Sequence, residues 1–418
     1  MREYEAIVIG GGSAGLAASV ALHNEGVTDI LLLERDQELG GILNQCIHNG
    51  FGLKVFKEEL TGPEYAERYK DIFVEKNIPY KTNTMVISCD KNRIVEYANK
   101  DEGFVKIKGK AIIMTTGCYE RNAGAIQLPG DRPSGIITAG TAQKYLNMDG
   151  YLVGKKVFIL GSGDIGLIMA RRMTLEGAEV LGVAEIMPYS GGLNRNIVQC
   201  LDDYNIPLYL NHTITSIKGK DHIEQIVLQE VKDFIPIKGT EKTFDVDTLL
   251  LSIGLIPEQS LAEKAGIILH SKTKGPMVDE SYQTNIDGIF ACGNALHVHD
   301  LVDFVSTESE RAGKAAAQYI KRSDKNVGLS VNTIANKGIS YIVPQTIHPK
   351  SIEQNLELFL RVDGVYQDMD LVIKSGEKEI KRYKKRHLAP AEMERIIIPK
   401  QWLVDINHDL EISLEAMK

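Results

Sequence analysis

Cysteine is scarce in this chain: five cysteines are spread over 418 residues, and no two are spaced as C-x-x-C. Zinc knuckles, thioredoxin-type redox pairs and local iron–sulfur sites use that spacing, so the sequence argues against all three. The odd number and wide scatter of the cysteines also argue against a disulfide-stapled secreted domain. We therefore expect a reducing compartment, the cytoplasm.

Long hydrophobic runs are also missing, because no segment reaches the roughly 18 consecutive apolar residues of a membrane helix. The apolar N-terminal stretch MREYEAIVIGGGSAGLAASVAL is interrupted by glycines, so it indicates a strand, a turn and a helix and not a signal peptide. The net charge of −8 argues against a nucleic-acid partner. No compact Ser/His/Asp cluster, metal-ligand spacing or basic clamp is visible, so we expect no metal site and cannot assign the small-molecule substrate.

The first informative pattern lies in YEAIVIGGGSAGLAASVALHNEGVTDILLLERD. A short apolar run leads into Gly10-x-Gly12-x-x-Gly15, a helical pattern follows, and a second apolar run ends at Glu34. In such a unit the first glycine permits a tight turn, the second lets a pyrophosphate approach the backbone, and the third lets the helix pack on the strand. The helix N-terminus attracts the phosphates, and the acid accepts hydrogen bonds from a ribose. This context predicts a dinucleotide site.

The same unit recurs 151 residues later in KKVFILGSGDIGLIMARRMTLEGAEVLGVAEIMP. Gly161, Gly163, Gly166 and Glu185 repeat the three glycines and the acid at one constant offset. Two dinucleotide sites suggest that electrons pass from one cofactor to another. A carboxylate at position 185 favours NAD(H) over NADP(H), because it repels a 2′-phosphate, although two arginines at 171–172 could receive one.

Three further motifs carry a family resemblance over about residues 1–325. AIIMTTGCYER, DTLLLSIGLIPE and TNIDGIFACGNA resemble the two crossings between domains and the late FAD motif of the two-dinucleotide-binding FAD/NAD(P) oxidoreductases, which are related to the pyridine nucleotide-disulfide reductases. The resemblance implies an α/β fold class with two Rossmann-like, three-layer dinucleotide-binding domains. We expect a discontinuous FAD domain at 1–120 and 245–325, and an NAD domain at 121–244. Short strands separated by turn signals predict a small all-β domain at 326–418, whose role is open.

The resemblance also implies which residues contact each cofactor. In the family the late motif ends in Gly-Asp, and here the acid is replaced by Asn294, which can still form hydrogen bonds but lacks the negative charge. The expected FAD residues are Gly10, Gly12, Ser13, Ala14, Gly15, Glu34, Arg35, Gly41, Asn44, Val86, Thr116, Gly117, Gly293, Asn294 and Val302. The expected NAD residues are Gly161, Gly163, Asp164, Ile165, Gly166 and Glu185.

A narrower resemblance involves TTGCYERNAGAIQLPGDRPSGIITAGTAQ and GGILNQCIHNGFG. These stretches are similar to the FAD/NAD subunits of heteromeric sarcosine oxidase, opine oxidase, hydrogen cyanide synthase and dye-linked proline dehydrogenase, and to proteins encoded beside anaerobic glycerol-3-phosphate dehydrogenase. The resemblance implies a homo-oligomer, a second flavoprotein dehydrogenase subunit, or both.

Candidate catalytic residues are few. Cys46 is interpreted in three ways: as a redox thiol beside the flavin, as a residue lining the flavin pocket, or as a small buried residue. His48 follows it in the same loop. His297 and His299 alternate in what reads as an extended segment, so we expect them to face opposite sides, with His299 a candidate proton donor.

The sequence thus predicts an FAD-dependent oxidoreductase that exchanges electrons with NAD(H), as a subunit of a dehydrogenase for glycerol 3-phosphate or an amine. One alternative is a self-contained NADH-dependent oxidase or reductase that uses a single redox cysteine. Another is a non-catalytic assembly subunit that only binds nucleotides.

Overall fold

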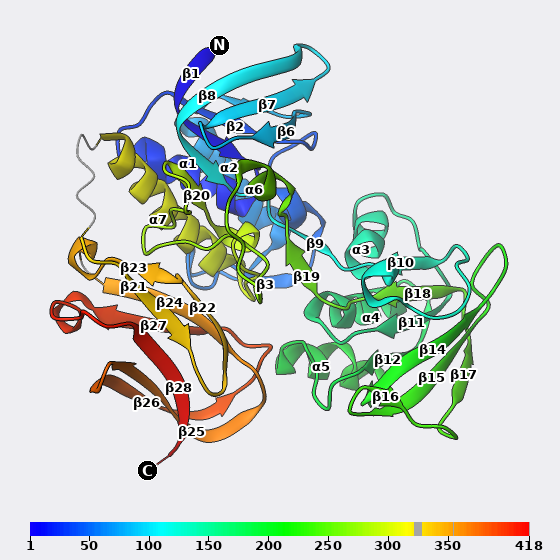
Figure 1. Ribbon diagram of the computed structural model, residues 1–418. Helices are drawn as coiled ribbons and strands as arrows, with labels where there is room; N and C mark the ends of the chain where they lie inside the picture. Colours follow the sequence, from blue (N-terminus) through cyan, green and yellow to red (C-terminus); the bar gives the residue numbers. More distant parts are fainter. Residues whose placement is uncertain (322–327, 354, 418) are drawn as a thin grey trace. The chain divides into compact units, whose positions relative to one another are not determined.

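The computed structural model describes residues 1–321, 328–353 and 355–417. The chain forms two compact units, one made of Met1–Cys118 with Pro257–Lys418 and the other of Tyr119–Ile256 (Figure 1). No helix in the described part of the chain is both long and apolar enough to cross a membrane.

A seven-stranded sheet forms the centre of the first unit. The five parallel strands are β5 (Tyr80–Lys81), β2 (Ile30–Leu33), β1 (Arg2–Ile9), β8 (Gly103–Met114) and β20 (Ile289–Ala291), and the antiparallel ones are β7 (Ile94–Asn99) and β6 (Met85–Cys89). Most apolar residues of β1, β2, β20 and the second half of β8 are buried on both faces, as in other parallel sheets covered by helices. The two antiparallel strands extend the sheet along the first half of the longest strand.

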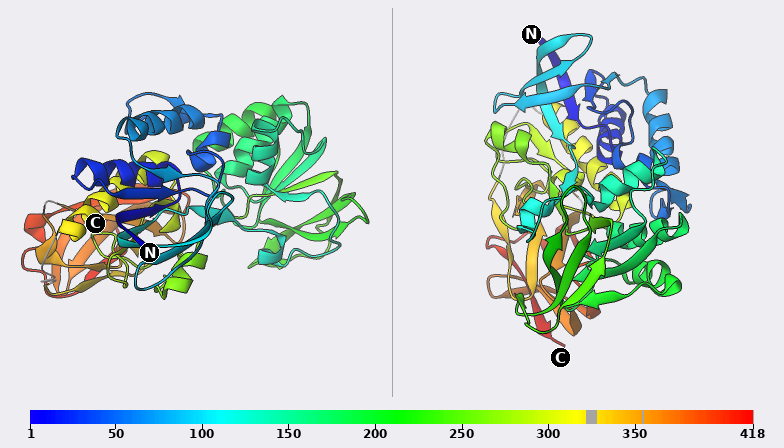
Figure 2. Two further views of the ribbon diagram at one scale, coloured as in Figure 1. Left: turned by 90° about the horizontal axis from the view of Figure 1, so that it is seen from above. Right: turned by 90° about the vertical axis from the view of Figure 1, so that its right-hand side faces the viewer.

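Helices α1 (Ser13–Asn24) and α7 (Val302–Lys321) pack closely against each other although nearly 300 residues separate them (Figures 1 and 2). Small side chains allow the approach, since a Cβ at Gly313 would lie 2.4 Å from the carbonyl oxygen of Ala18. A third helix, α2 (Gly62–Glu75), begins with a capping box between Thr61 and Glu64. The contact between α1 and α7 fixes the late part of the chain beside the first glycine turn.

The second unit repeats the plan of a parallel sheet covered by helices. An antiparallel sheet follows it within the same unit. The parallel strands are β10 (Ile136–Thr138), β18 (Thr248–Leu251), β11 (Lys156–Leu160), β12 (Glu179–Glu185) and β13 (Leu208–Leu210). The helices are α3 (Ala139–Asn147), α4 (Asp164–Leu175) and α5 (Asn194–Cys200), and the antiparallel strands are β14 (His212–Lys218), β15 (Gln225–Lys232), β16 (Ile235–Pro236) and β17 (Lys242–Asp245).

The C-terminal segment is all-β and has its own hydrophobic core. One sheet contains β23 (Thr346–Ile347), β21 (Val331–Ala335), β28 (Leu410–Ala416), β25 (Tyr366–Ser375) and β26 (Lys378–Leu388). The other contains β22 (Ile339–Val343), β24 (Asn355–Val362) and β27 (Glu394–Pro399). The predicted fold class, with two Rossmann-like domains, a discontinuous first domain and a C-terminal β domain, is therefore confirmed.

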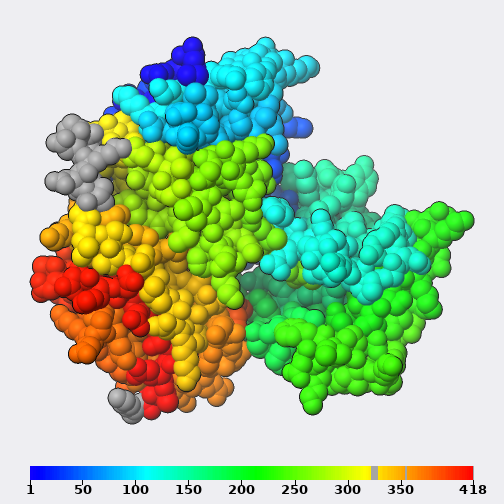
Figure 3. Space-filling model, in the orientation of Figure 1, coloured from blue at the N-terminus to red at the C-terminus, as the bar shows by residue number. Residues whose placement is uncertain are grey.

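The C-terminal segment belongs to the first compact unit, and Figure 3 shows it (orange to red) directly against the yellow-green part of that unit. Polar contacts explain the attachment: Arg361 forms an ion pair with Asp300 and donates a hydrogen bond to the carbonyl of Val298 at 3.1 Å. The second carboxylate oxygen of Asp300 accepts a hydrogen bond from the backbone N–H of Met393 at 2.6 Å. The expected boundary between residues 325 and 326 lies outside the described residues.

A second attachment joins His348, just after β23, to Glu280. One carboxylate oxygen of Glu280 lies 2.9 Å from the backbone N–H of His348 and 3.1 Å from its Nδ1. The hydrogen bond with Glu280 raises the pKa of His348, and partial burial opposes this.

We expect this attachment to weaken as the pH rises through neutrality. A histidine whose pKa is raised by folding stabilises the protein below its unfolded pKa, about 6.5, and loses that contribution as the pH passes the folded pKa. His348→Gln should therefore cost on the order of 0.5–1 kcal/mol at pH 6 and much less at pH 8. Denaturant unfolding at both pH values measures the loss of unfolding free energy, and the variant His387→Gln, at an exposed histidine, is the control. An equal loss at both pH values would contradict the prediction.

Candidate functional site

The first glycine turn connects β1 to α1. Gly10 has a φ of 110°, a conformation that suits glycine, and a Cβ at Gly15 would lie only 1.8 Å from the carbonyl oxygen of Gly10. Gly12 differs, because the nearest atom to a Cβ there would be Cα of Gly41, at 4.0 Å. The fold itself thus requires glycine at positions 10 and 15, while position 12 borders open space of the kind a pyrophosphate would occupy.

The carboxylate of Glu34 closes this turn. It lies just after β2, is buried, and accepts hydrogen bonds from the backbone N–H of Gly11 at 2.5 Å and of Asp36 at 2.8 Å. These two donors hold an acidic side chain beside the glycine turn, where the motif places the acid that binds an adenosine ribose.

The second turn has the same construction in the second unit. Gly161 has a φ of 94°, and a Cβ at Gly166 would lie 2.6 Å from Cβ of Ser252. Glu185, at the end of β12, accepts hydrogen bonds from Ser162 through its backbone N–H at 3.0 Å and its Oγ at 2.7 Å, and from the N–H of Met187 at 3.0 Å. Both acids are therefore anchored by the glycine turn that they face.

Two of the other expected NAD residues lie at the start of α4. Asp164 is already engaged within the protein, because its Oδ1 accepts hydrogen bonds from the N–H of Leu193 at 2.8 Å and from Nδ2 of Asn196 at 2.7 Å. Ile165 follows it in the first turn of the helix, and a Cβ at Gly163 would approach Oγ of Ser252 at 3.0 Å.

The remaining expected FAD residues all lie in the first unit. Gly41 packs against the first turn, where a Cβ would be 3.1 Å from Cα of Gly12, and Asn44 donates a hydrogen bond to the carbonyl of Leu39 at 3.0 Å. Ser13 and Ala14 open α1, Arg35 follows Glu34, Val86 lies in β6, Thr116 and Gly117 follow β8, Gly293 and Asn294 follow β20, and Val302 is the first residue of α7.

Sequence reasoning missed Thr115, the residue that holds the first turn from the neighbouring strand. Its hydroxyl lies 2.9 Å from the carbonyl oxygens of both Ile9 and Gly10. The Thr-Thr-Gly sequence after β8 could have indicated this role. Its second threonine, Thr116, is an expected FAD residue, whereas the first threonine, Thr115, holds the glycine turn.

Asp303 in the first turn of α7 was also missed. Its buried carboxylate accepts hydrogen bonds from the backbone N–H groups of Gly52 at 3.1 Å, Lys54 at 2.9 Å and Val55 at 2.8 Å. This aspartate fixes the end of the loop that carries Cys46 onto the start of α7. An acidic residue at a helix start was a weak signal, and nothing in the sequence indicated its partners.

Cys46 lies in an environment that favours the neutral thiol. Burial raises the pKa of Cys46 to about 12, and its Sγ donates a hydrogen bond to the carbonyl of Ile42 at 3.3 Å. A redox thiol needs a stabilised thiolate, so this environment weighs against the first of the three interpretations. His48, in the same loop, is half-buried with its ring centroid 5.0 Å from that of Phe51.

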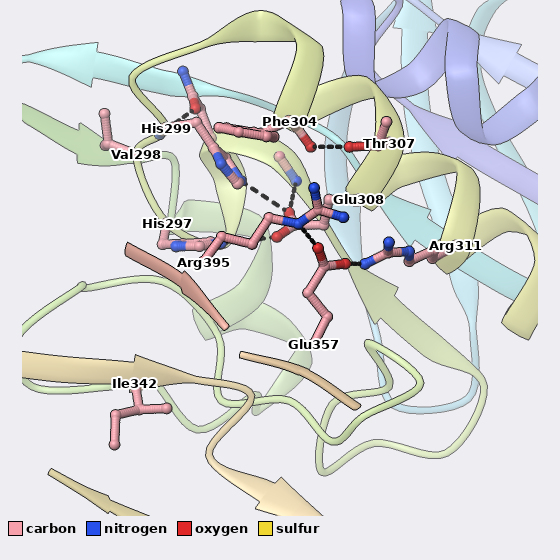
Figure 4. Close-up of polar contacts among 12 residues, drawn as sticks. His297, Val298, His299, Phe304, Thr307, Glu308, Arg311, Ile342, Glu357 and Arg395 are labelled. Carbon is pink, nitrogen blue, oxygen red and sulfur yellow. Dashed lines mark hydrogen bonds and ion pairs between the residues drawn. The ribbon is translucent and has the colours of Figure 1, made fainter. Parts of the chain in front are cut away.

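The expectation that His297 and His299 face opposite sides is wrong. The segment bends instead of continuing as a strand, and the two ring centroids lie 4.2 Å apart (Figure 4). Both imidazoles meet Glu308 of α7: His297 Nε2 is 2.8 Å from Oε2, and His299 Nε2 is 3.2 Å from Oε1. The backbone N–H of Gly293 donates to Oε1 of Glu308 at 2.7 Å.

The protonation of this cluster follows from its burial. Burial lowers the pKa of His297 to about 4, so this imidazole is neutral near pH 7. Burial alone would raise the pKa of Glu308, but the two adjacent imidazoles outweigh it and lower the pKa overall. Glu308 is therefore a buried carboxylate, and no signal in the sequence indicated it.

Asn294 contacts this cluster on one side and Cys118 on the other. Its Oδ1 accepts a hydrogen bond from the N–H of His299 at 3.0 Å, and its Nδ2 lies 3.7 Å from Sγ of Cys118. A carboxylate could accept the first contact but could not donate the second, which gives the Asp-to-Asn departure a structural reason.

The two glycine turns, each followed by a helix and closed by an anchored acid, define a two-dinucleotide oxidoreductase fold. The chain belongs to the pyridine nucleotide-disulphide oxidoreductase family, whose pattern it matches over residues 4–318. The protein is therefore an FAD-dependent oxidoreductase that also binds a nicotinamide cofactor.

Known proteins resemble the chain at low identity. It is 26% identical to an NADH oxidase of Methanocaldococcus jannaschii over 343 residues, which are 77% of this chain and 69% of that protein. It is 24% identical to an opine oxidase subunit of Agrobacterium tumefaciens over 317 residues, 71% of this chain but only 62% of that protein. The crystal structure of T. acidophilum thioredoxin reductase matches with a TM-score of 0.62 at 22% identity, covering 76% of this chain and 99% of that one, and this likeness shows the fold.

Alanine substitutions should separate the glycine that serves the ligand from the glycine that serves the fold. We expect Gly12→Ala to keep the stability of the FAD-free protein but weaken FAD binding on the order of 100-fold, because the methyl group occupies the space of the pyrophosphate. Gly15→Ala should destabilise the FAD-free protein as well, given the 1.8 Å clash. Thermal unfolding and flavin fluorescence measure both, with Gly364→Ala as the control. Full FAD affinity in Gly12→Ala would refute this assignment.

Proposed function

We propose that this protein transfers electron pairs between NAD(H) and FAD and exchanges them with a second flavoprotein subunit that oxidises a small molecule such as glycerol 3-phosphate or an amine. The observation that carries the proposal is the presence of two matched glycine turns, each with its own anchored acid. One turn would hold FAD and the other NAD(H). Bound FAD supplies the two-electron chemistry, and the chain supplies binding, orientation and electrostatics.

The preference for NAD(H) rests on Glu185. Its carboxylate is fixed by Ser162 and Met187, so it cannot turn away from an incoming ribose without losing three hydrogen bonds. A ribose 2′-hydroxyl can donate to such a group, whereas a 2′-phosphate would be repelled.

The partner subunit is proposed on two grounds. The Agrobacterium relative is named as a subunit of opine oxidase, and the five cysteines of this chain form no disulfide. With no C-x-x-C pair and with Cys46 held as a neutral thiol, a disulfide relay within the chain lacks support, and a partner is the natural exchange site for electrons. The cysteine pattern also supports a cytoplasmic location.

A self-contained NADH oxidase is the second candidate, favoured by the relative from Methanocaldococcus jannaschii that bears this name. In that case electrons from NADH would leave the flavin without a partner subunit, with oxygen or a thiol-linked acceptor receiving them.

Nicotinamide selectivity tests the main proposal. We expect anaerobic NADH to bleach the oxidised flavin of the wild-type protein, and NADPH to act at least about tenfold less effectively, because the charge repulsion costs about 1.4 kcal/mol or more. Glu185→Ser should remove most of this difference. Glu179→Ser, at the exposed opposite end of β12, should leave it unchanged. If neither nucleotide bleached the flavin, the proposal would be contradicted, and the result would indicate a non-catalytic assembly subunit.

Replacement of Cys46 separates the two candidate enzymes. We expect NADH to bleach the flavin of Cys46→Ser within about twofold of the wild-type rate, because a half-buried thiol held in its neutral form takes no part in the transfer. Oxygen consumption in the presence of NADH should also be unchanged and slow. A wild-type protein that consumes oxygen rapidly, and loses this activity in Cys46→Ser, would favour the self-contained oxidase instead.

A further inference from the structure

The cluster of His297, His299 and Glu308 contains more hydrogen-bonding capacity than the surrounding protein uses. All three side chains are buried, and each contributes one nitrogen or oxygen to a group of atoms that lie within 4.8 Å of one another. Glu308 is fully satisfied by its contacts with Gly293 and His297. The imidazole of His299 is not.

Both ring nitrogens of His299 lack a hydrogen bond to any described residue, although the side chain is fully buried. Its Nε2 approaches Oε1 of Glu308 to 3.2 Å, but the approach lacks hydrogen-bond geometry. Each imidazole nitrogen donates or accepts a hydrogen bond, and burying both nitrogens without a partner is costly. A further group bound between Nε2 of His299 and the carboxylate of Glu308 would give this nitrogen a partner.

We propose that His297, His299 and Glu308 bind a divalent first-row transition metal, zinc or ferrous iron, at a structural site beside the expected FAD residues Gly293 and Asn294. Two imidazoles and one carboxylate are a ligand set that these ions favour. The donor separations of 2.8 Å and 3.2 Å also fit, because ligands that share one ion at about 2.0–2.2 Å stand about 3 Å apart.

The charges around the cluster are compatible with a cation. The oxygen ligand would be the carboxylate of Glu308, and Arg361, whose charge acts on His297, is paired with Asp300. Farther along α7, Arg311 pairs with Glu357, which also pairs with Arg395 (Figure 4). The second cluster, Asp279, Glu280 and His348, gives no such reason for an ion, because none of its side-chain atoms is among the described buried atoms that lack a hydrogen bond.

The proposed ion would join three segments of the first unit. His297 and His299 lie between β20 and α7, and Glu308 lies within α7. Phe359 of β24 covers both imidazoles, with ring centroids 5.5 Å from His297 and 5.4 Å from His299. The metal would fix the backbone that carries Asn294 and would be shielded from solvent by the C-terminal β segment.

Elemental analysis of the full-length, FAD-loaded protein tests the site directly. Protein produced in medium supplemented with zinc and iron should retain one of these metals at about one ion per chain through desalting, and its thermal midpoint should exceed that of chelator-treated protein. Anomalous scattering from crystals should place the ion between the three side chains. Metal-free protein whose stability is unaffected by either metal would overturn the proposal.

Variants link the metal to these residues. His299→Gln and Glu308→Gln should each lower the metal content at least about tenfold, whereas His348→Gln, in the other histidine–carboxylate cluster, should retain it. The flavin absorbance spectrum reports whether each variant is folded, and His299→Gln alone suffices if the Glu308 variant fails to fold. Undiminished metal content in folded His299→Gln would place the ion elsewhere and contradict the proposal.

Discussion

The constraint on which both nucleotide sites depend is the hydrogen bond between a strand-end carboxylate and the backbone of a glycine turn. Glu34 accepts from Gly11, and Glu185 accepts from Ser162, and the donor and acceptor are 23 positions apart in both cases. This bond fixes the turn and at the same time orients the acid toward the position of a ribose. The geometry of nucleotide binding and the local fold of the turn therefore depend on the same hydrogen bond. The chain contains this hydrogen bond twice, once at each turn.

Helix α7 organises the rest of the first unit. Gly313 lets it approach α1, Asp303 holds the loop that follows Cys46, and Glu308 gathers the two histidines. Each of these contacts joins segments that are distant in sequence or fixes a bend that sequence periodicity does not reveal. The first unit is thus held together by a helix whose polar residues face inward as often as its apolar ones.

The repeated turns could be predicted from the sequence because their requirements are local. A strand, three glycines, a helix and an acid lie within about 30 residues, and each has a physical role that restricts the residue type. The all-β character of the C-terminal segment was visible for the same reason, since its alternating strands and turns are short-range signals.

Long-range polar contacts could not be predicted. Asp303 and its partners are about 250 residues apart, and the bend that brings His297 and His299 together depends on how the segment packs against Glu308 and Phe359. Alternation predicts opposite faces only for an extended strand, and the backbone here is not extended. The raised pKa of the Cys46 thiol shows the same limit, because the partial burial that causes it arises from tertiary packing and not from its neighbours in sequence.

Binding of NAD⁺ to the FAD-loaded protein tests the central claim, two distinct nucleotide sites on one chain, most directly. Titration calorimetry should give about one NAD⁺ per chain with no loss of bound FAD, and Gly163→Val should abolish NAD⁺ binding while FAD stays in place. Displacement of FAD by NAD⁺, or an absence of binding to the wild-type protein, would contradict the account.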